Sequence, residues 1–71
     1  MTRYLIVIKE STIGYSAYAP DLPGCIAAAR TRGEVEKQMQ EAIDTHIRGL
    51  RLAGAEVPLP RSEPSYCDTN A

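Results

Sequence analysis

The sequence predicts an α+β domain in which a three-stranded antiparallel sheet carries one helix, with room for a short fourth strand near the end of the chain. Three observations predict this architecture. Short apolar segments occupy the first part of the chain, one long amphipathic segment follows them, and a proline-containing stretch comes last. The predicted order is β-β-β-α with an optional final β, because a helix laid across a sheet buries the apolar side of both.

Three segments are predicted to be strands. Residues 3–9 are apolar in both alternation phases, which indicates a strand that is covered at least in part on both faces. Residues 15–19 alternate between an apolar face and a face that carries Ser16 and Tyr18. Residues 25–29 have small side chains, so we expect the helix to approach this strand closely.

The helix has the strongest local signal. Thr31 and Glu34 form the capping-box pattern Thr-x-x-Glu, and apolar residues then recur at about 100° per residue. Gly54, with Pro58 soon after it, supplies the expected C-terminal stop. The predicted apolar stripe consists of Val35, Met39, Ala42, Ile43, His46, Ile47, Leu50 and Ala53.

The chain divides into residues 1–60, which hold the predicted domain, and residues 61–71, a tail. Within this tail Ser65-Tyr66-Cys67 is the candidate for the optional short edge strand, and the residues after it are expected to fray. A chain of 71 residues buries only about 60% of its unfolded surface, so its core is thin. Small domains without a covalent or metal staple often self-associate, and we therefore expect a homo-oligomer.

The composition argues against several classes of function. Eight Lys and Arg residues against nine Asp and Glu residues give a net charge of −1, which argues against nucleic-acid binding by bulk charge. No apolar run reaches the roughly 18 residues that a membrane span needs. The apolar stretch at the N-terminus is too short for a signal peptide. We therefore expect a cytoplasmic protein without a membrane partner.

Few residues are suited to catalysis or metal binding. Cys25 and Cys67 are far apart and belong to no Cys/His cluster, so we expect neither a metal nor a cofactor. Cys25 is predicted to be a buried, inert thiol. His46 is predicted to be a partly buried helix residue, because no nucleophile or orienting group stands at a recognisable spacing from it. We expect no catalytic residues and a protein that is not an enzyme.

The segment Pro20-Asp21-Leu22-Pro23-Gly24 is the most unusual in the sequence. Its two prolines and its glycine are incompatible with regular strand. It is either a structural corner between two strands or a rigid loop displayed to a partner, and the two roles are compatible. Tyr15 and Tyr18 flank the segment, and tyrosine is common in protein interfaces. The candidate partner-binding residues are Tyr15, Tyr18, Pro20, Asp21, Leu22, Pro23 and Gly24.

The stretch from Gly14 to Cys25 resembles the signature of the HicB-like antitoxin family, and the resemblance continues through the helix to Val57-Pro58-Leu59-Pro60. It covers residues 4–60. The resemblance implies a partial RNase H-like β-β-β-α-β fold and an antitoxin of a type II toxin–antitoxin system. Proteins of this family mask HicA-type toxins, which cleave mRNA, by direct protein contact. The resemblance thus implies a HicA-like toxin as the partner.

Many family members carry a DNA-binding segment after this domain. The residues that follow Pro60 are too few for a helix-turn-helix or a ribbon-helix-helix, so we expect no sequence-specific DNA binding by this chain alone. Two other functions stay open. One is a solitary oligomeric regulatory or structural protein of the same fold without a toxin partner. The other is a degenerate nuclease-like domain, against which the lack of acidic residues in the first predicted strand argues.

Overall fold

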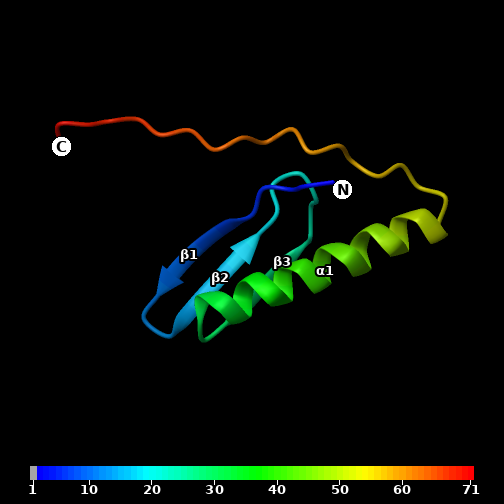
Figure 1. Cartoon of the computed structure of the whole chain (residues 1–71), viewed down its shortest axis with the longest axis horizontal. Coiled ribbons are helices and arrows are strands. Elements are labelled where there is room, and N and C mark those ends of the chain that lie inside the picture. Colours follow the sequence, from blue (N-terminus) through cyan, green and yellow to red (C-terminus); the bar gives the residue numbers. More distant parts are fainter. Residues whose placement is uncertain (1) are drawn as a thin grey trace.

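The computed structural model describes residues 2–71, which form three strands followed by one helix (Figure 1). Strand β1 spans Val7–Ser11, β2 spans Gly14–Tyr18, β3 spans Ile26–Ala29, and helix α1 spans Arg32–Leu52. The strands pair in the order β1-β2-β3, and each is antiparallel to its neighbour. The predicted α+β fold with a three-stranded antiparallel sheet and one helix is thereby confirmed.

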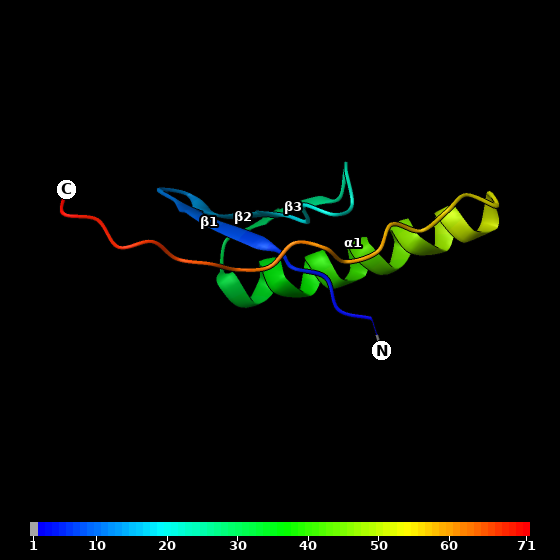
Figure 2. The same cartoon turned by 90° about the horizontal axis from the view of Figure 1, so that it is seen from above.

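The molecule has two layers, because α1 covers one face of the sheet and leaves the other face open (Figure 2). On β2, Ala17 faces the helix and is buried, whereas Ser16 and Tyr18 lie on the open face and are exposed. Short side chains on the covered face let α1 approach closely, so its Val35 and Met39 are fully buried. The buried core consists of Ala17, Ala19, Leu22, Cys25, Val35 and Met39.

The first strand begins later in the chain than the sequence predicts. The predicted strand covers residues 3–9, but β1 starts at Val7, which is paired with Tyr18 at the end of β2. The residues before Val7 therefore have no strand beside them. Their apolar side chains extend the core instead, because Tyr4 and Ile6 are partly buried and pack against the core residues.

Both ends of α1 agree with the prediction. The Thr31 side-chain oxygen accepts a hydrogen bond from the backbone N–H of Glu34 at 3.1 Å, as the capping-box pattern requires. At the other end Ala53 is the C-cap, and Gly54 follows with a φ of +70°, in the left-handed region that favours glycine.

The tight turn between β1 and β2 depends on Gly14. Its φ is +150°, and its Cα lies against the backbone of Ala29 and Arg30, where β3 leads into α1. A Cβ atom at this position would collide with the carbonyl oxygen of Ala29. Position 14 therefore requires glycine for two reasons: a side chain would collide with the backbone, and the positive φ disfavours other residues.

After α1 the chain turns back and runs as an extended strap, residues 55–62, past the N-terminal segment (Figure 1). One anchor of the strap is Tyr4, whose hydroxyl donates to the carbonyl oxygen of Pro58 at 2.6 Å. Beyond the strap, residues 63–71 form an arm that leaves the body of the molecule and ends far from it (Figures 1 and 2).

The fourth strand predicted at residues 65–67 is not formed. These residues are extended but have no ladder partner, and Tyr66 is 92% exposed. The optional strand is absent from this structure because the arm diverges from β1 and has no strand edge beside it (Figure 1). A strand needs such an edge to satisfy its backbone groups.

Candidate interaction surface

Residues 20–24, here called the signature loop, form a corner stabilised by their own backbone hydrogen bonds. The N–H of Ala19 donates to the carbonyl oxygen of Cys25 at 3.2 Å and closes the base of the loop. The N–H groups of Leu22 and Cys25 then donate to the carbonyl oxygens of Ala19 and Leu22, each at 3.1 Å. Gly24 adopts a φ of +85° within this corner. The interpretation of the segment as a structural corner is confirmed.

The residues predicted to bind a partner are divided between the core and the surface. Leu22 is 0% exposed and forms part of the core, so it is not available to a partner in this conformation. Tyr15 is half-buried, and its hydroxyl donates to the Glu10 carboxylate at 3.4 Å. Asp21 is bonded to the strap. The exposed members are Tyr18, Pro20, Pro23 and Gly24.

The Asp21 carboxylate joins the signature loop to the strap. Its Oδ2 accepts the backbone N–H groups of Arg61 at 2.9 Å and Ser62 at 2.8 Å, and its Oδ1 accepts the Ser62 hydroxyl at 2.9 Å. These backbone hydrogen bonds, that of Ser62 foremost, hold the pKa of Asp21 below its ordinary value, because they favour the charged form. We call this arrangement the Asp21 clasp.

Helix α1 is longer than the sheet on which it lies. Its 21 residues span about 31 Å, whereas a five-residue strand spans about 17 Å. The second half of α1, residues 43–52, therefore projects beyond the core. Its apolar side chains are only partly covered, and Leu52 is 84% exposed.

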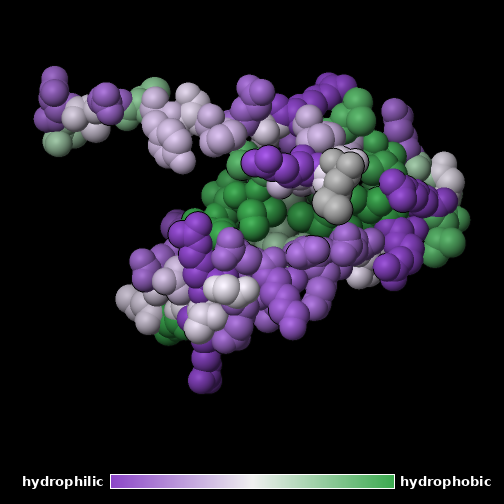
Figure 3. Space-filling view, viewed as in Figure 1, coloured by the Kyte–Doolittle hydropathy of each residue, from purple (hydrophilic) through white to green (hydrophobic). Residues whose placement is uncertain are grey.

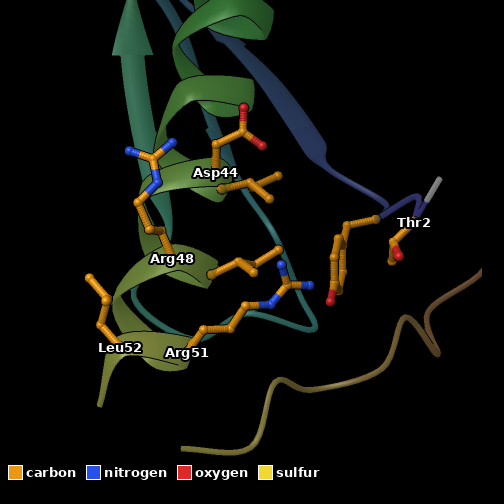
Figure 4. A pocket seen from close by; sticks show the side chains of 8 residues that line it. Thr2, Asp44, Arg48, Arg51 and Leu52 are labelled. Carbon is orange, nitrogen blue, oxygen red and sulfur yellow. The ribbon is translucent and has the colours of Figure 1, made fainter. Parts of the chain in front are cut away.

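An open groove, here called the main groove, lies between this half of α1 and the N-terminal segment (Figure 4). Tyr4, Ile43 and Ile47 contribute apolar side chains to its lining, and its volume is about 540 Å³. Apolar surface gathers in a hollow on this side of the molecule, bordered by polar surface (Figure 3). The remaining lining residues are Thr2, Asp44, Arg48, Arg51 and Leu52.

A second, shallower groove of about 500 Å³ borders the other side of α1, and we call it the loop groove. Its walls are residues 24–26 from the signature loop and β3, and Glu41, Thr45 and His46 are among the helix residues that face them. The same helix is therefore bordered by a groove on each side. The loop groove links the signature loop to α1.

A metal site would need several His, Cys, Asp or Glu side chains close together. Within residues 2–71, no three His, Cys, Asp or Glu side chains lie close enough together to hold a metal ion. Burial raises the pKa of the Cys25 thiol, which favours its protonated form. The prediction that Cys25 is buried is confirmed. His46 is half-buried in the wall of the loop groove.

The structure contains no helix in residues 2–71 that is long and apolar enough to cross a membrane. This protein is a small α+β domain with surfaces suited to binding. It has a thin core, a rigid corner loop and two open grooves along one helix. The chain belongs to the HicB-like antitoxin family. The family profile, described as "HicB_like antitoxin of bacterial toxin-antitoxin system", matches residues 4–70.

Three relatives illustrate the similarity. A chain in a structure of the HicA3 and HicB3 toxin–antitoxin complex is 34% identical with a TM-score of 0.72, and the match covers 86% of this chain and 71% of that one. A crystal structure of antitoxin HicB3 has a TM-score of 0.70 at 34% identity, over 86% of this chain and 45% of that chain. An uncharacterized 14.9 kDa protein in the rep-hol intergenic region of Haemophilus phage HP1 (strain HP1c1) is 39% identical over 61 residues. The match covers 86% of this chain but 44% of the phage protein.

The sequence prediction missed the main groove. The sequence places Tyr4 in a strand and places Ile43 and Ile47 only in the apolar stripe of the helix. A signal for the groove was nevertheless present, because the stripe continues along a helix of 21 residues while the strands have only four or five. When the apolar stripe of a helix extends past the end of the sheet, its last apolar side chains have no strand to pack against.

Proposed function

We propose that this chain is an antitoxin that neutralises a HicA-type, mRNA-cleaving toxin by direct protein contact. The observation that carries the proposal is the similarity of its fold, at a TM-score of 0.72, to a chain in the HicA3 and HicB3 toxin–antitoxin complex. The open grooves along α1 support it, because they offer apolar and polar groups to another protein. On this proposal the chain acts by covering the toxin and catalyses no reaction of its own.

The proposed contact surface is centred on the second half of α1. The main groove lies on one side of this helix and the loop groove on the other, so a partner that sits over residues 43–52 reaches both. The exposed residues of the signature loop, Pro20, Pro23 and Gly24, complete the surface beside the loop groove. A stable interface needs about 800 Å² from each partner, which exceeds what a five-residue loop offers.

The other expected properties follow as parts of the same proposal. The chain self-associates and acts in the cytoplasm. We assign the domain to the partial RNase H-like fold that the family resemblance implies, with residues 1–60 as the domain and residues 61–71 as its tail. Its three antiparallel strands followed by one helix are consistent with this assignment.

The test is an RNA-cleavage assay with a HicA-type toxin recovered by co-expressing this chain with its neighbouring open reading frames. We expect cleavage to fall to background when the chain and the toxin are present in equal amounts, and a stable complex to elute in size-exclusion chromatography. Full cleavage in the presence of a tenfold excess of the chain would contradict the proposal.

A solitary oligomer is the alternative that this experiment separates from the antitoxin. The exposed apolar side of α1 would serve a second copy as well as a toxin, because Ile47 and Leu52 are incompletely covered in the single chain. Undiminished cleavage together with a self-associated state at micromolar concentration would favour the oligomer. Inhibition of cleavage at equal amounts would favour the antitoxin.

A further inference from the structure

The signature loop has a polar side chain that faces the protein itself. Asp21 accepts three hydrogen bonds from two residues of the strap, which follow it by 40 and 41 positions in the sequence. Two of the donors are backbone N–H groups. The carboxylate therefore holds the main chain of the strap at residues 61 and 62, in addition to the side chain of Ser62.

The Asp21 carboxylate supplies hydrogen-bond acceptors for backbone N–H groups of the strap. The strap belongs to no strand or helix, so its N–H groups have no regular ladder to join. Hydrogen bonds to a charged carboxylate are shorter and stronger than those to a neutral acceptor. Beyond Ser62 the structure gives no hydrogen bond between the arm and the body in residues 63–71, so Ser62 is the last described residue that a hydrogen bond ties to the body.

The clasp also shapes the surface beside β1. Residues 62–64 form one wall of a cavity of about 740 Å³, opposite the N-terminal residues 3–6 and Ile8. Arg32 and Glu36 from the first turns of α1 close another side. Ser62 is the residue of this wall that the clasp holds.

The arm carries an aromatic side chain with no function inside the single chain. Tyr66 is 92% exposed, the highest value among the exposed large hydrophobic side chains. Tyrosine contributes large contact area at a low cost in side-chain entropy, which makes it a frequent interface residue. An arm held at its base loses less freedom when it meets a partner than an arm that is free along its whole length.

We propose that Asp21 is a positioning residue, which clasps Arg61 and Ser62 so that the arm starts from a fixed point on the body and presents Tyr66 to the toxin. This inference rests on the proposed function for the identity of the partner. It assigns Asp21 a role inside the antitoxin in place of direct contact with a partner. The signature loop thereby links the domain to the arm.

The first test needs only this chain. In Asp21→Asn we expect amide hydrogen exchange at Arg61 and Ser62 to rise about tenfold, and the heteronuclear NOE of the arm to fall, while exchange at Met39 stays unchanged. Asp68→Asn is the matched control, because Asp68 lies in the exposed arm and removing its charge leaves the clasp intact. Ser62→Ala, which removes one of the three hydrogen bonds, should produce a smaller rise. Unchanged exchange at both residues in Asp21→Asn would overturn the clasp.

The second test is a double-mutant cycle on the Kd of the toxin complex with Asp21→Asn and Tyr66→Ser in the full chain. If Asp21 acts through the arm, each change should weaken binding about tenfold, and the double variant should be no weaker than either single one. Multiplied losses would show that Asp21 contacts the toxin directly, and no loss in either variant would show that the arm does not bind it. Both results overturn the inference.

The two tests separate failure of the inference from failure of the proposed function. If the wild-type chain does not bind the toxin, the proposed function fails, and the role of the arm fails with it. The exchange experiment still decides whether Asp21 clasps the strap, because it uses no partner.

Discussion

The two halves of α1 are built from the same kind of apolar stripe but meet different surroundings. In the first half, Val35 and Met39 are fully buried against the sheet. In the second half, Ile43 and Ile47 are only half-buried, and Leu52 is 84% exposed. The difference arises because the strands end while the helix continues.

This comparison separates the residues that stabilise the fold from those available to a partner. A side chain enclosed on all sides contributes its full transfer free energy to folding. A half-covered side chain still has surface to bury, and it can bury that surface against another protein. We therefore assign stability to the first half of α1 and recognition to the second half.

The largest expected effect is on stability, in Met39→Ala. The side chain is 0% exposed, and its removal leaves a cavity between α1 and the sheet. The free energy of unfolding should fall by about 2–5 kcal/mol, which is most of the stability of a domain of this size. Urea denaturation followed by circular dichroism measures the change. Gln40→Ala, at the neighbouring exposed position, should alter it by less than about 0.5 kcal/mol.

Gly14→Ala should disturb the point where the sheet leads into the first half of α1. The new Cβ would meet the Ala29 carbonyl oxygen, so the lead-in to the helix must shift. We expect a loss of roughly 1–3 kcal/mol in the free energy of unfolding, seen as a lower Tm. Gly33→Ala is the contrasting variant, because no atom lies within 4 Å of its Cβ position. It should raise stability by up to about 1 kcal/mol, and a loss of stability there would contradict the account.

Leu52→Ser should separate recognition from stability in the second half of α1. Because the side chain is 84% exposed, the free energy of unfolding should change by less than about 0.5 kcal/mol. The Kd of the toxin complex should rise about tenfold. Ile13→Ser is the matched control, since Ile13 is 89% exposed but lies in the turn between β1 and β2. An equal loss of affinity in both variants would argue against a specific surface on α1.

The smallest expected effect concerns pH and the strap. The pKa of Asp21 lies below its ordinary value of 3.8, since the N–H groups of Ser62 and Arg61, the Ser62 hydroxyl and the Arg61 charge all favour the carboxylate. The stabilisation is therefore fully present above that value and is lost as the pH falls through the lowered pKa. The amide chemical shifts of Arg61 and Ser62 should stay constant from pH 8 to pH 5 and change below about pH 4. Asp21→Asn should abolish this titration; its persistence in the variant would assign it to another group.

Local patterns were sufficient to predict the elements of this fold. The Thr31 cap, the Gly54 stop and the small residues of β3 each act within a few residues, and each has the structure that its chemistry predicts. The start of β1 was not predictable in this way. It depends on where β2 ends, because a residue before Val7 has no partner across the ladder.

The candidate site was predicted only in part, because its decisive contacts are not local. The signature loop is recognisable as a rigid corner, but the donors that reach Asp21 come from residues 40 and 41 positions later. Arg61 and Ser62 carry no sequence pattern that marks them as partners of a carboxylate. Leu22 shows the converse error, since a loop residue predicted to meet a partner proved to be part of the core.

The central claim is that the second half of α1 meets the toxin, and NMR mapping tests it most directly. The ¹⁵N-labelled chain would be titrated with unlabelled HicA-type toxin, and backbone amide shifts followed to saturation. The account predicts that the largest changes fall on residues 43–52, on Tyr4, on residues 24–26 and on Tyr66, with little change at the exposed residues of the open sheet face, Ser16 and Ala28. Changes confined to that open face, or none at equal amounts of the two proteins, would contradict it.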